Sequence, residues 1–280
     1  MKFVNHNSRE KALLKYVFNS LSYMDVWICN IIEGYIYEKV EKINYIGYRE
    51  EYTERYRKRE GEYKEWYKDG SKKTIKNYKD GEQFGLLEGW HIDGTPSVYA
   101  ASFNEKGMIN GVCKGWYENG NPMYEIYYQN GEEQGTRIDY YTNGKPTMLR
   151  NYINGLQVGE YKYWNEDGTL STDGIYNDNG NLIKLKQYNN NGKLYLEKTF
   201  IENNISEDKG YYSSGKLQYI KMLKGNKRDG EYTSYWDCDE VKLCVRTTYK
   251  NNVLDGEYEE RKKDGTLKEK CFYKDGEKQV

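Results

Sequence analysis

The chain has 280 residues, a formal net charge of −1, and 43 Lys and Arg side chains against 44 Asp and Glu side chains. This balance argues against nucleic acid or an anionic membrane as the partner, and the low net charge argues against intrinsic disorder. The 32 Tyr and 6 Trp residues supply apolar surface with a polar tip, which suits a thin sheet better than a thick aliphatic core.

Residues 1–60 are expected to form a distinct N-terminal part. From Asn7 to Ile32, apolar residues recur at spacings of three and four, which predicts an amphipathic helix that begins at a capping box of Asn7 and Glu10. Such a helix would cap the open end of a repeat array. Residues 34–59 are expected to form degenerate strands.

The N-terminus carries charges where a secretory signal peptide would be apolar, and the chain has no run of about 18 apolar residues. A cytoplasmic protein without a signal peptide or a transmembrane helix is therefore expected. The five cysteines are odd in number and form no CxxC pair. Reduced thiols are expected, rather than a disulfide framework or a structural zinc site.

A repeat of about 24 residues occupies the rest of the chain, residues 61–280. Its units open at Gly61, Gly85, Gly111, Gly135, Gly159, Gly230 and Gly256. The turn position lies nine residues later and is glycine in every unit except one, which has Asp239. These repeat-turn glycines are Gly70, Gly94, Gly120, Gly144, Gly168 and Gly265.

An aromatic column lies five residues after each opening glycine, and only Arg261 interrupts it. Its members are Trp66, Trp90, Trp116, Tyr140, Trp164 and Tyr235. A second column, eight residues after the turn glycine, consists of Tyr78, Tyr128, Tyr152, Tyr176 and Tyr273. All three prolines of the chain, Pro96, Pro122 and Pro146, lie two residues after a turn glycine, so the phase of the repeat is consistent.

Asp-Gly and Asn-Gly favour tight hairpin turns, and the Tyr-, Trp- and Thr-rich segments between them favour strands. Each unit is predicted to be strand, turn, strand and then a link such as Lys79–Gly81. Between Gly168 and Gly192 the turn glycines recur every 12 residues, which indicates half-units of one strand and one connection. The pattern leaves the register of residues 174–229 open.

These features predict an all-β fold: an elongated antiparallel β-hairpin repeat array, in the form of an open meander or solenoid, with an N-terminal helix. The pattern G-x-Y-x-x-W-Y-x-x-G resembles the MORN repeat, in the variant common in bacteria. The best copies are GEYKEWYKDG (61–70), KGWYENGNP (114–122), GEYKYWNEDGTL (159–170) and GEYEERKKDGTL (256–267). The resemblance implies protein or lipid scaffolding. Bacterial chains of this variant look like the YwqK-type antitoxin or immunity family, which implies binding and neutralising a toxin.

No cofactor, metal site or catalytic site is expected, so the chain is predicted not to be an enzyme. The histidines are His6 and His91. His91 follows the aromatic column, where other units have a tyrosine, and is interpreted as an ordinary strand residue. Column acids such as Asp69 are interpreted as turn formers, and the loop 177–180 lacks the ligand spacing of a calcium site.

The aromatic column is the predicted binding surface, because Tyr and Trp concentrate at binding hot spots. The competing interpretation is that the column only packs the sheet. The predicted function is a non-catalytic protein-binding scaffold, whose partner would be a toxin if the role follows the resemblance. The alternative is a module that binds cell-wall carbohydrate or lipid. Choline-binding repeats also place Trp-Tyr-Tyr before a glycine turn, whereas lipid binding needs a basic stripe. The oligomeric state is left open.

Overall fold

The computed structural model describes residues 37–279 apart from residues 45 and 56, and the described residues form 21 β-strands and no helix. The chain divides into two compact units, one up to Met108 and one from Ile109. Within each unit the described strand pairs are antiparallel and join strands consecutive in the chain. The predicted all-β antiparallel meander is thus confirmed. The helix expected over residues 7–32 lies outside the described residues.

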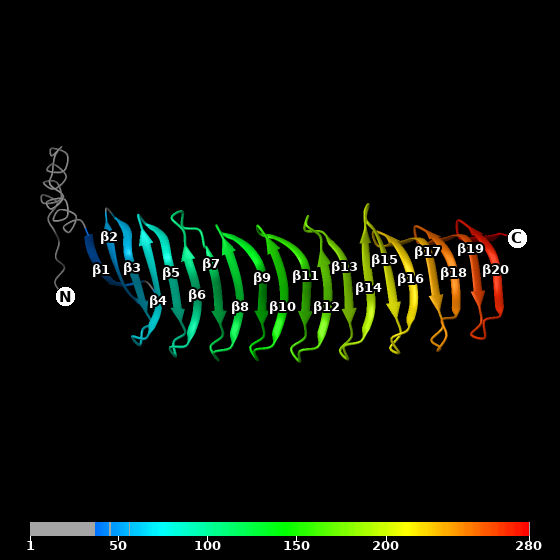
Figure 1. Ribbon diagram of the computed structural model, residues 1–280, viewed down its shortest axis with the longest axis horizontal. Helices are drawn as coiled ribbons and strands as arrows, with labels where there is room; N and C mark the ends of the chain where they lie inside the picture. Colours follow the sequence, from blue (N-terminus) through cyan, green and yellow to red (C-terminus); the bar gives the residue numbers. More distant parts are fainter. Residues whose placement is uncertain (1–36, 45, 56, 280) are drawn as a thin grey trace, which may run out of the picture. The chain divides into compact units, whose positions relative to one another are not determined.

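The first unit is a meander of six strands, drawn from blue to cyan in Figure 1. They are β1 (Tyr37–Ile43), β2 (Arg49–Arg55), β3 (Lys58–Trp66), β4 (Lys72–Lys79), β5 (Glu82–Trp90) and β6 (Pro96–Phe103). Strands β1 and β2 lie in the stretch where degenerate strands were expected.

The second unit continues the same pattern through fifteen strands, which lie side by side in chain order (Figure 1). They are β7 (Gly111–Trp116), β8 (Pro122–Gln129), β9 (Glu132–Tyr140), β10 (Pro146–Ile153), β11 (Leu156–Trp164), β12 (Leu170–Tyr176), β13 (Leu182–Tyr188), β14 (Leu194–Ile201), β15 (Ile205–Tyr211), β16 (Leu217–Lys224), β17 (Lys227–Tyr235), β18 (Leu243–Lys250), β19 (Val253–Arg261), β20 (Leu267–Lys274) and β21 (Glu277–Gln279).

The repeat-turn glycines lie in five-residue loops. In the loop from Tyr67 to Ser71, the Gly70 N–H donates to the Tyr67 carbonyl at 3.0 Å and the Tyr67 N–H donates to the Ser71 carbonyl at 2.9 Å. Gly70 has a φ of 91°, as expected where a type I turn ends in a left-handed residue. The Asp69 carboxylate accepts hydrogen bonds from the Ser71 backbone and hydroxyl at 2.9 and 2.6 Å, which closes the loop.

The tight two-residue turns lie elsewhere than the sequence predicted. A type I′ turn needs positive φ at both central residues, and Asp80 and Gly81 meet this condition with φ values of 52° and 91°. Asn130-Gly131, Asn154-Gly155 and Asp275-Gly276 have the same conformation. The Gly70 column thus lies in hairpin loops, as expected, but these loops have five residues. The two-residue turns are instead at pairs such as Asp80-Gly81, which was interpreted as a link. Asp-Gly occurs in both kinds of turn. The difference is the residue before glycine, which has positive φ at Asp80 but not at Asp69.

The structure gives the register that the sequence left open. The loops Asn165–Thr169, Asn177–Asn181 and Asn189–Lys193 all have the five-residue form. Between β12 and β13 this loop therefore stands where other repeats have a two-residue turn, and turn glycines recur every 12 residues. The meander passes through the region without a break in pairing from β12 to β17.

One face of each unit is more buried than the other. Directly paired residues of an antiparallel sheet share a face, and successive residues of a strand lie on opposite faces. In the first unit such pairing forms a row of Val40, Tyr52, Tyr63, Lys76 and Leu87. Tyr52 and Tyr63 are 6% and 4% exposed. We call this the tyrosine face of the unit and the row its central row.

The second unit has an equivalent central row that crosses β9 to β20. It consists of Arg137, Arg150, Tyr161, Gly174, Leu185, Lys198, Asp208, Lys221, Tyr232, Thr247, Tyr258 and Cys271. By strand alternation the buried residues Cys113, Ile126 and Tyr152 lie on this same face, which is the tyrosine face of the second unit.

Candidate binding surface

The predicted aromatic column lies at the last residue of its strands, next to the five-residue loops. Trp90 is paired with Pro96, Trp116 with Pro122 and Trp164 with Leu170. By alternation the column faces away from the tyrosine face in each unit, and all six members are half-buried. The Arg49 guanidinium lies 3.9 Å from the Trp66 ring centroid. The column is thus placed against neighbouring side chains, with part of each ring accessible.

The tyrosines that follow the column join consecutive repeats. Their hydroxyls donate to the backbone carbonyl of the column residue in the next repeat. The bonds are Tyr67 to Trp90 at 2.8 Å, Tyr117 to Tyr140 at 2.7 Å, Tyr141 to Trp164 at 2.8 Å and Tyr212 to Tyr235 at 2.9 Å. We call these four residues the loop-edge tyrosines. Because each bond spans 23 residues, they hold each loop in register with the next one in its unit.

The tyrosine face of the first unit combines stacked rings with cations. The rings of Tyr52 and Tyr63 are stacked with centroids 5.8 Å apart. The Arg59 guanidinium lies 4.9 Å from the Tyr52 centroid and 4.8 Å from that of Tyr63, within the range of a cation–π contact. Its Nη1 also donates to the Tyr78 hydroxyl at 3.2 Å. Burial, together with the nearby acids Glu65 and Glu50, raises the pKa of Tyr63, so this hydroxyl stays neutral.

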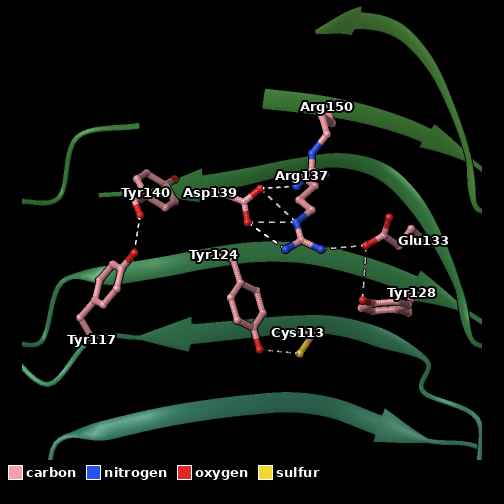
Figure 2. A network of polar contacts seen from close by, with 9 residues as sticks. All are labelled: Cys113, Tyr117, Tyr124, Tyr128, Glu133, Arg137, Asp139, Tyr140 and Arg150. Carbon is pink, nitrogen blue, oxygen red and sulfur yellow. Dashed lines mark hydrogen bonds and ion pairs between the residues drawn. The ribbon is translucent and has the colours of Figure 1, made fainter. Parts of the chain in front are cut away.

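A polar network replaces the stacked tyrosines at one place in the second unit (Figure 2). Arg137 occupies the position that is Tyr63 or Tyr161 in other repeats. Its Nε donates to both oxygens of Asp139 at 3.1 Å, and its Nη1 donates to Glu133 at 2.9 Å. Arg150 Nη2, from β10, donates to the same Asp139 at 2.7 Å.

The charges of this network balance. Two guanidiniums face two carboxylates, and Arg137 also lies 5.6 Å from the Tyr124 ring centroid. Burial opposes the charge of Arg137, but its hydrogen bonds to Asp139 and Glu133 outweigh burial and raise the pKa of the guanidinium. Burial alone would raise the pKa of Asp139, yet the hydrogen bonds from Arg137 and Arg150 hold it below its ordinary value. The network is therefore ionised and balanced in charge, and among the described residues the buried Nε of Arg150 is left without a hydrogen-bond partner.

Tyr124 and Cys113 border the network (Figure 2). The Tyr124 hydroxyl and the Cys113 sulfur lie 3.7 Å apart, and either could donate. Burial, and then the contact with Cys113, raises the pKa of Tyr124 to about 12, and burial raises the pKa of the Cys113 thiol. A neutral thiol is a poor nucleophile, so Cys113 and Tyr124 are interpreted as packing residues.

Sequence reasoning missed the tyrosine face. Its strongest signal is the residue two places after the opening glycine, which is Tyr63, Tyr161, Tyr232 and Tyr258 in four units. The second tyrosine column lies beside it: Tyr78 packs edge-on against Tyr63 with centroids 6.1 Å apart. The Arg137 network has no such signal, because its partners come from different positions of β9 and β10.

The other candidates considered in the sequence include two histidines. His91 lies at the start of a five-residue loop, where its N–H donates to the Thr95 carbonyl at 2.8 Å, and His6 lies outside the described residues. Among the residues that the structure describes, no three His, Cys, Asp or Glu side chains lie together in a way that could hold a metal ion. Within the same residues, no helix is both long and apolar enough to cross a membrane.

Comparison with known families supports the repeat. The family described as MORN repeat variant matches residues 59–80, 109–130, 133–154 and 254–275. Each match begins two residues before an opening glycine and covers a strand, its five-residue loop and the following strand. No curated protein matches the chain. MORN repeats are in general modules that bind proteins or membranes. The chain is thus a MORN repeat protein, with four matched copies of the variant repeat.

Proposed function

We propose that this chain is a non-catalytic scaffold that binds another protein through its tyrosine faces. The observation that carries the proposal is a contrast between positions of the repeat. Turn glycines recur because the loops share one geometric requirement. Apart from its recurrent tyrosines, the central row of the second unit does not recur: it runs through Arg150, Leu185, Lys198 and other unlike residues. The geometry of the repeat therefore does not by itself determine which residues occupy this row.

The chemistry of the row suits protein recognition. Tyr and Arg are over-represented among residues that dominate binding energy, because they combine apolar area with directional hydrogen bonds. In the row, Tyr161 lies next to Arg150, Tyr232 lies next to Lys221, and Tyr258 lies next to Thr247. A partner of mixed character would match such a surface better than a uniformly apolar or uniformly charged ligand.

We further propose that the protein bound is a toxin and that binding neutralises it. This specific role is supported by the resemblance to the YwqK-type antitoxin or immunity family. It needs only a stable complex that covers the toxin, and no reaction in this chain.

Site-specific photo-crosslinking tests the proposal in the native cell. A photoreactive phenylalanine analogue placed at Leu185 samples the central row. The same analogue at Ile175, which is 41% exposed and lies on the opposite face by alternation, is the matched control. We expect one defined protein to be crosslinked from position 185 and not from position 175. Absence of a protein adduct at 185, or equal adducts at both positions, would contradict the proposal.

The toxin role has its own test. The crosslinked partner, expressed alone in a heterologous host, should arrest growth, and co-expression of the full chain should restore it. A Leu185→Glu variant should fail to restore growth, whereas Ile175→Glu should restore it. A partner that is harmless on its own would remove the toxin role and leave the scaffold role intact.

A further inference from the structure

Strands β14 to β17 carry three cations on the tyrosine face of the second unit. Lys198 and Lys221 belong to the central row, on either side of Asp208. Arg228 lies on β17, paired with Leu223, the second residue after Lys221. We call these four charged residues, with the rings of Tyr219, Tyr232 and Tyr249, the basic-aromatic patch.

Asp208 is shared by two lysines and saturates neither. Its Oδ1 lies 3.5 Å from Lys198 Nζ and its Oδ2 lies 3.7 Å from Lys221 Nζ. The side chain of Asp208 is 7% exposed, whereas each lysine side chain is 24% exposed. An ammonium group has three N–H donors, so both lysines keep donors that Asp208 does not use. The aspartate draws the two ammonium groups together and leaves one positive charge in excess.

Arg228 adds a second positive charge. Its guanidinium lies 5.5 Å from the Tyr232 centroid and 5.2 Å from that of Tyr249, and its Nη1 donates to the Tyr249 hydroxyl at 3.4 Å. Among the described residues, no carboxylate lies within ion-pair distance of it. The Tyr232 ring is stacked on Tyr219, with centroids 6.4 Å apart. The aromatic wall orients Arg228 without neutralising it.

The Arg137 network shows what compensation looks like in the same unit. There, hydrogen bonds of 2.7 to 3.1 Å join two guanidiniums to two carboxylates. In the basic-aromatic patch, three cations share one carboxylate at 3.5 and 3.7 Å. Each cation also contacts an aromatic ring, but the cations outnumber the carboxylates. An excess of partly desolvated positive charge costs stability, so the fold alone gives no reason for this arrangement.

We propose that the basic-aromatic patch binds an acidic segment of the partner protein, one carboxylate bridging Lys198 and Lys221 and a second meeting Arg228. This inference rests on the proposed function and names the chemistry of the partner. Arg228 pairs with Leu223, two residues after Lys221 on the same strand. Neighbouring strands lie about 5 Å apart, so one extended segment can reach both cations. Alternate residues of an extended chain lie about 6.5 Å apart. A Glu-x-Glu segment therefore matches the patch.

The composition of the basic-aromatic patch favours a protein segment over a membrane. Recognition of anionic lipid uses clusters of about four to eight basic residues on an open surface. The patch has three cations around a buried aspartate, in a chain whose net charge is −1. Tyrosine rings beside the cations also suit a peptide, since they can pack against its side-chain stems.

Fluorescence anisotropy tests the proposal with the full chain and two labelled peptides. One peptide alternates Glu with Ser, and the other has Gln in place of every Glu. At low ionic strength, where screening is weakest, the Glu peptide should bind and the Gln peptide should not. Lys198→Gln with Lys221→Gln should weaken binding about tenfold, equivalent to about 1.4 kcal/mol. Arg228→Gln should weaken it severalfold. Lys186→Gln, on the opposite face of β13 by alternation, is the matched control and should leave binding unchanged.

Asp208→Asn supplies a readout that a merely structural role would not produce. Loss of the competing carboxylate should tighten binding of the Glu peptide, provided circular dichroism shows a folded chain. Failure of the wild-type chain to bind the Glu peptide, or equal binding by the double lysine variant, would overturn the proposal. A third outcome would also overturn it: the wild-type chain binds phosphatidylserine vesicles but not the Glu peptide, and the double lysine variant no longer binds the vesicles. If crosslinking from position 185 still captures a protein in those cases, the scaffold function stands and only its acidic chemistry falls.

Discussion

The loop-edge tyrosines should be a principal source of coupling between neighbouring repeats. Tyr141→Phe removes one hydroxyl and leaves the ring. In the structure that hydroxyl donates to the Trp164 carbonyl at 2.8 Å and lies 3.3 Å from the Tyr163 hydroxyl. Hydrogen bonding to Tyr163, followed by burial, raises the pKa of Tyr141 to about 12, which is consistent with a hydroxyl that is held in place.

The magnitude follows from the number of bonds. A neutral hydrogen bond contributes about 0.5–1.5 kcal/mol net, so Tyr141→Phe should lower the free energy of unfolding by about 1 kcal/mol. Changing Tyr117, Tyr141 and Tyr212 together should cost about 3 kcal/mol, because each bond joins a different pair of repeats and distant sites add. For a unit of this size, each kcal/mol should lower Tm by about 2–4 °C.

Urea unfolding followed by circular dichroism measures these changes, with the slope m checked for constancy. The matched control is Tyr127→Phe, since Tyr127 is 43% exposed and its hydroxyl makes no hydrogen bond in the described part of the chain. Tyr127→Phe should be neutral within about 0.5 kcal/mol. If the triple variant were as stable as this control, the loop-edge bonds would not couple the repeats and the reasoning would be wrong.

Three further predictions concern the tyrosine face of the second unit. Gly210→Ala should cost about 1–3 kcal/mol, because a Cβ there would overlap the ring of Tyr219; the cost should largely vanish in a Tyr219→Leu background, as a double-mutant cycle of melting curves would show. Asp139 has a depressed pKa in the folded state, so its contribution to stability is present above the unfolded pKa of about 3.9 and is lost as pH falls through the lower folded pKa. Asp139→Asn should therefore flatten the acid limb of the stability curve and lower stability at neutral pH, since Arg137 loses its main partner; an unchanged acid limb would refute the assignment. Tyr124 has a folded pKa of about 12, so its contribution is present below the unfolded pKa of about 10 and is lost between about pH 10 and 12. Tyr124→Phe should remove one late-ionising tyrosine from the 295 nm absorbance titration, and an identical titration curve would count against its burial.

The fold was predictable because its determinants are local and repeated. Proline cannot donate to a ladder and is tolerated at the first residue of a strand, and Pro96, Pro122 and Pro146 begin β6, β8 and β10. Glycine nine residues after each opening glycine marked the loops. The class of each turn was harder to predict, because Asp-Gly serves both as a two-residue turn at Asp80-Gly81 and as part of a longer loop at Asp69-Gly70.

The candidate surface was less predictable than the fold. The aromatic column attracts attention because Trp is rare and regularly spaced, yet the structure places it away from the tyrosine face. Which face is buried depends on strand alternation counted from the bulges, and a shift of one residue reverses it. The pairing shift between Arg150 and Asn151 lies opposite Gly159, and that between Tyr52 and Thr53 lies opposite Gly61; both glycines have positive φ. The opening glycines therefore mark the bulges, although the sequence alone does not show how each bulge shifts the pairing.

The Arg137 network and the basic-aromatic patch together separate what the fold requires from what recognition selects. Where Arg137 replaces a tyrosine in the central row, Glu133 and Asp139 on the same strand supply the opposite charge. The charge of a residue in the central row can thus be neutralised by acidic residues of the same repeat. Lys198, Lys221 and Arg228 lack a comparable set of acids, although the surrounding strands offer equivalent positions. Under the proposed function, the uncompensated charge of this cluster is available to a partner, and an acidic partner is the one that would complete it.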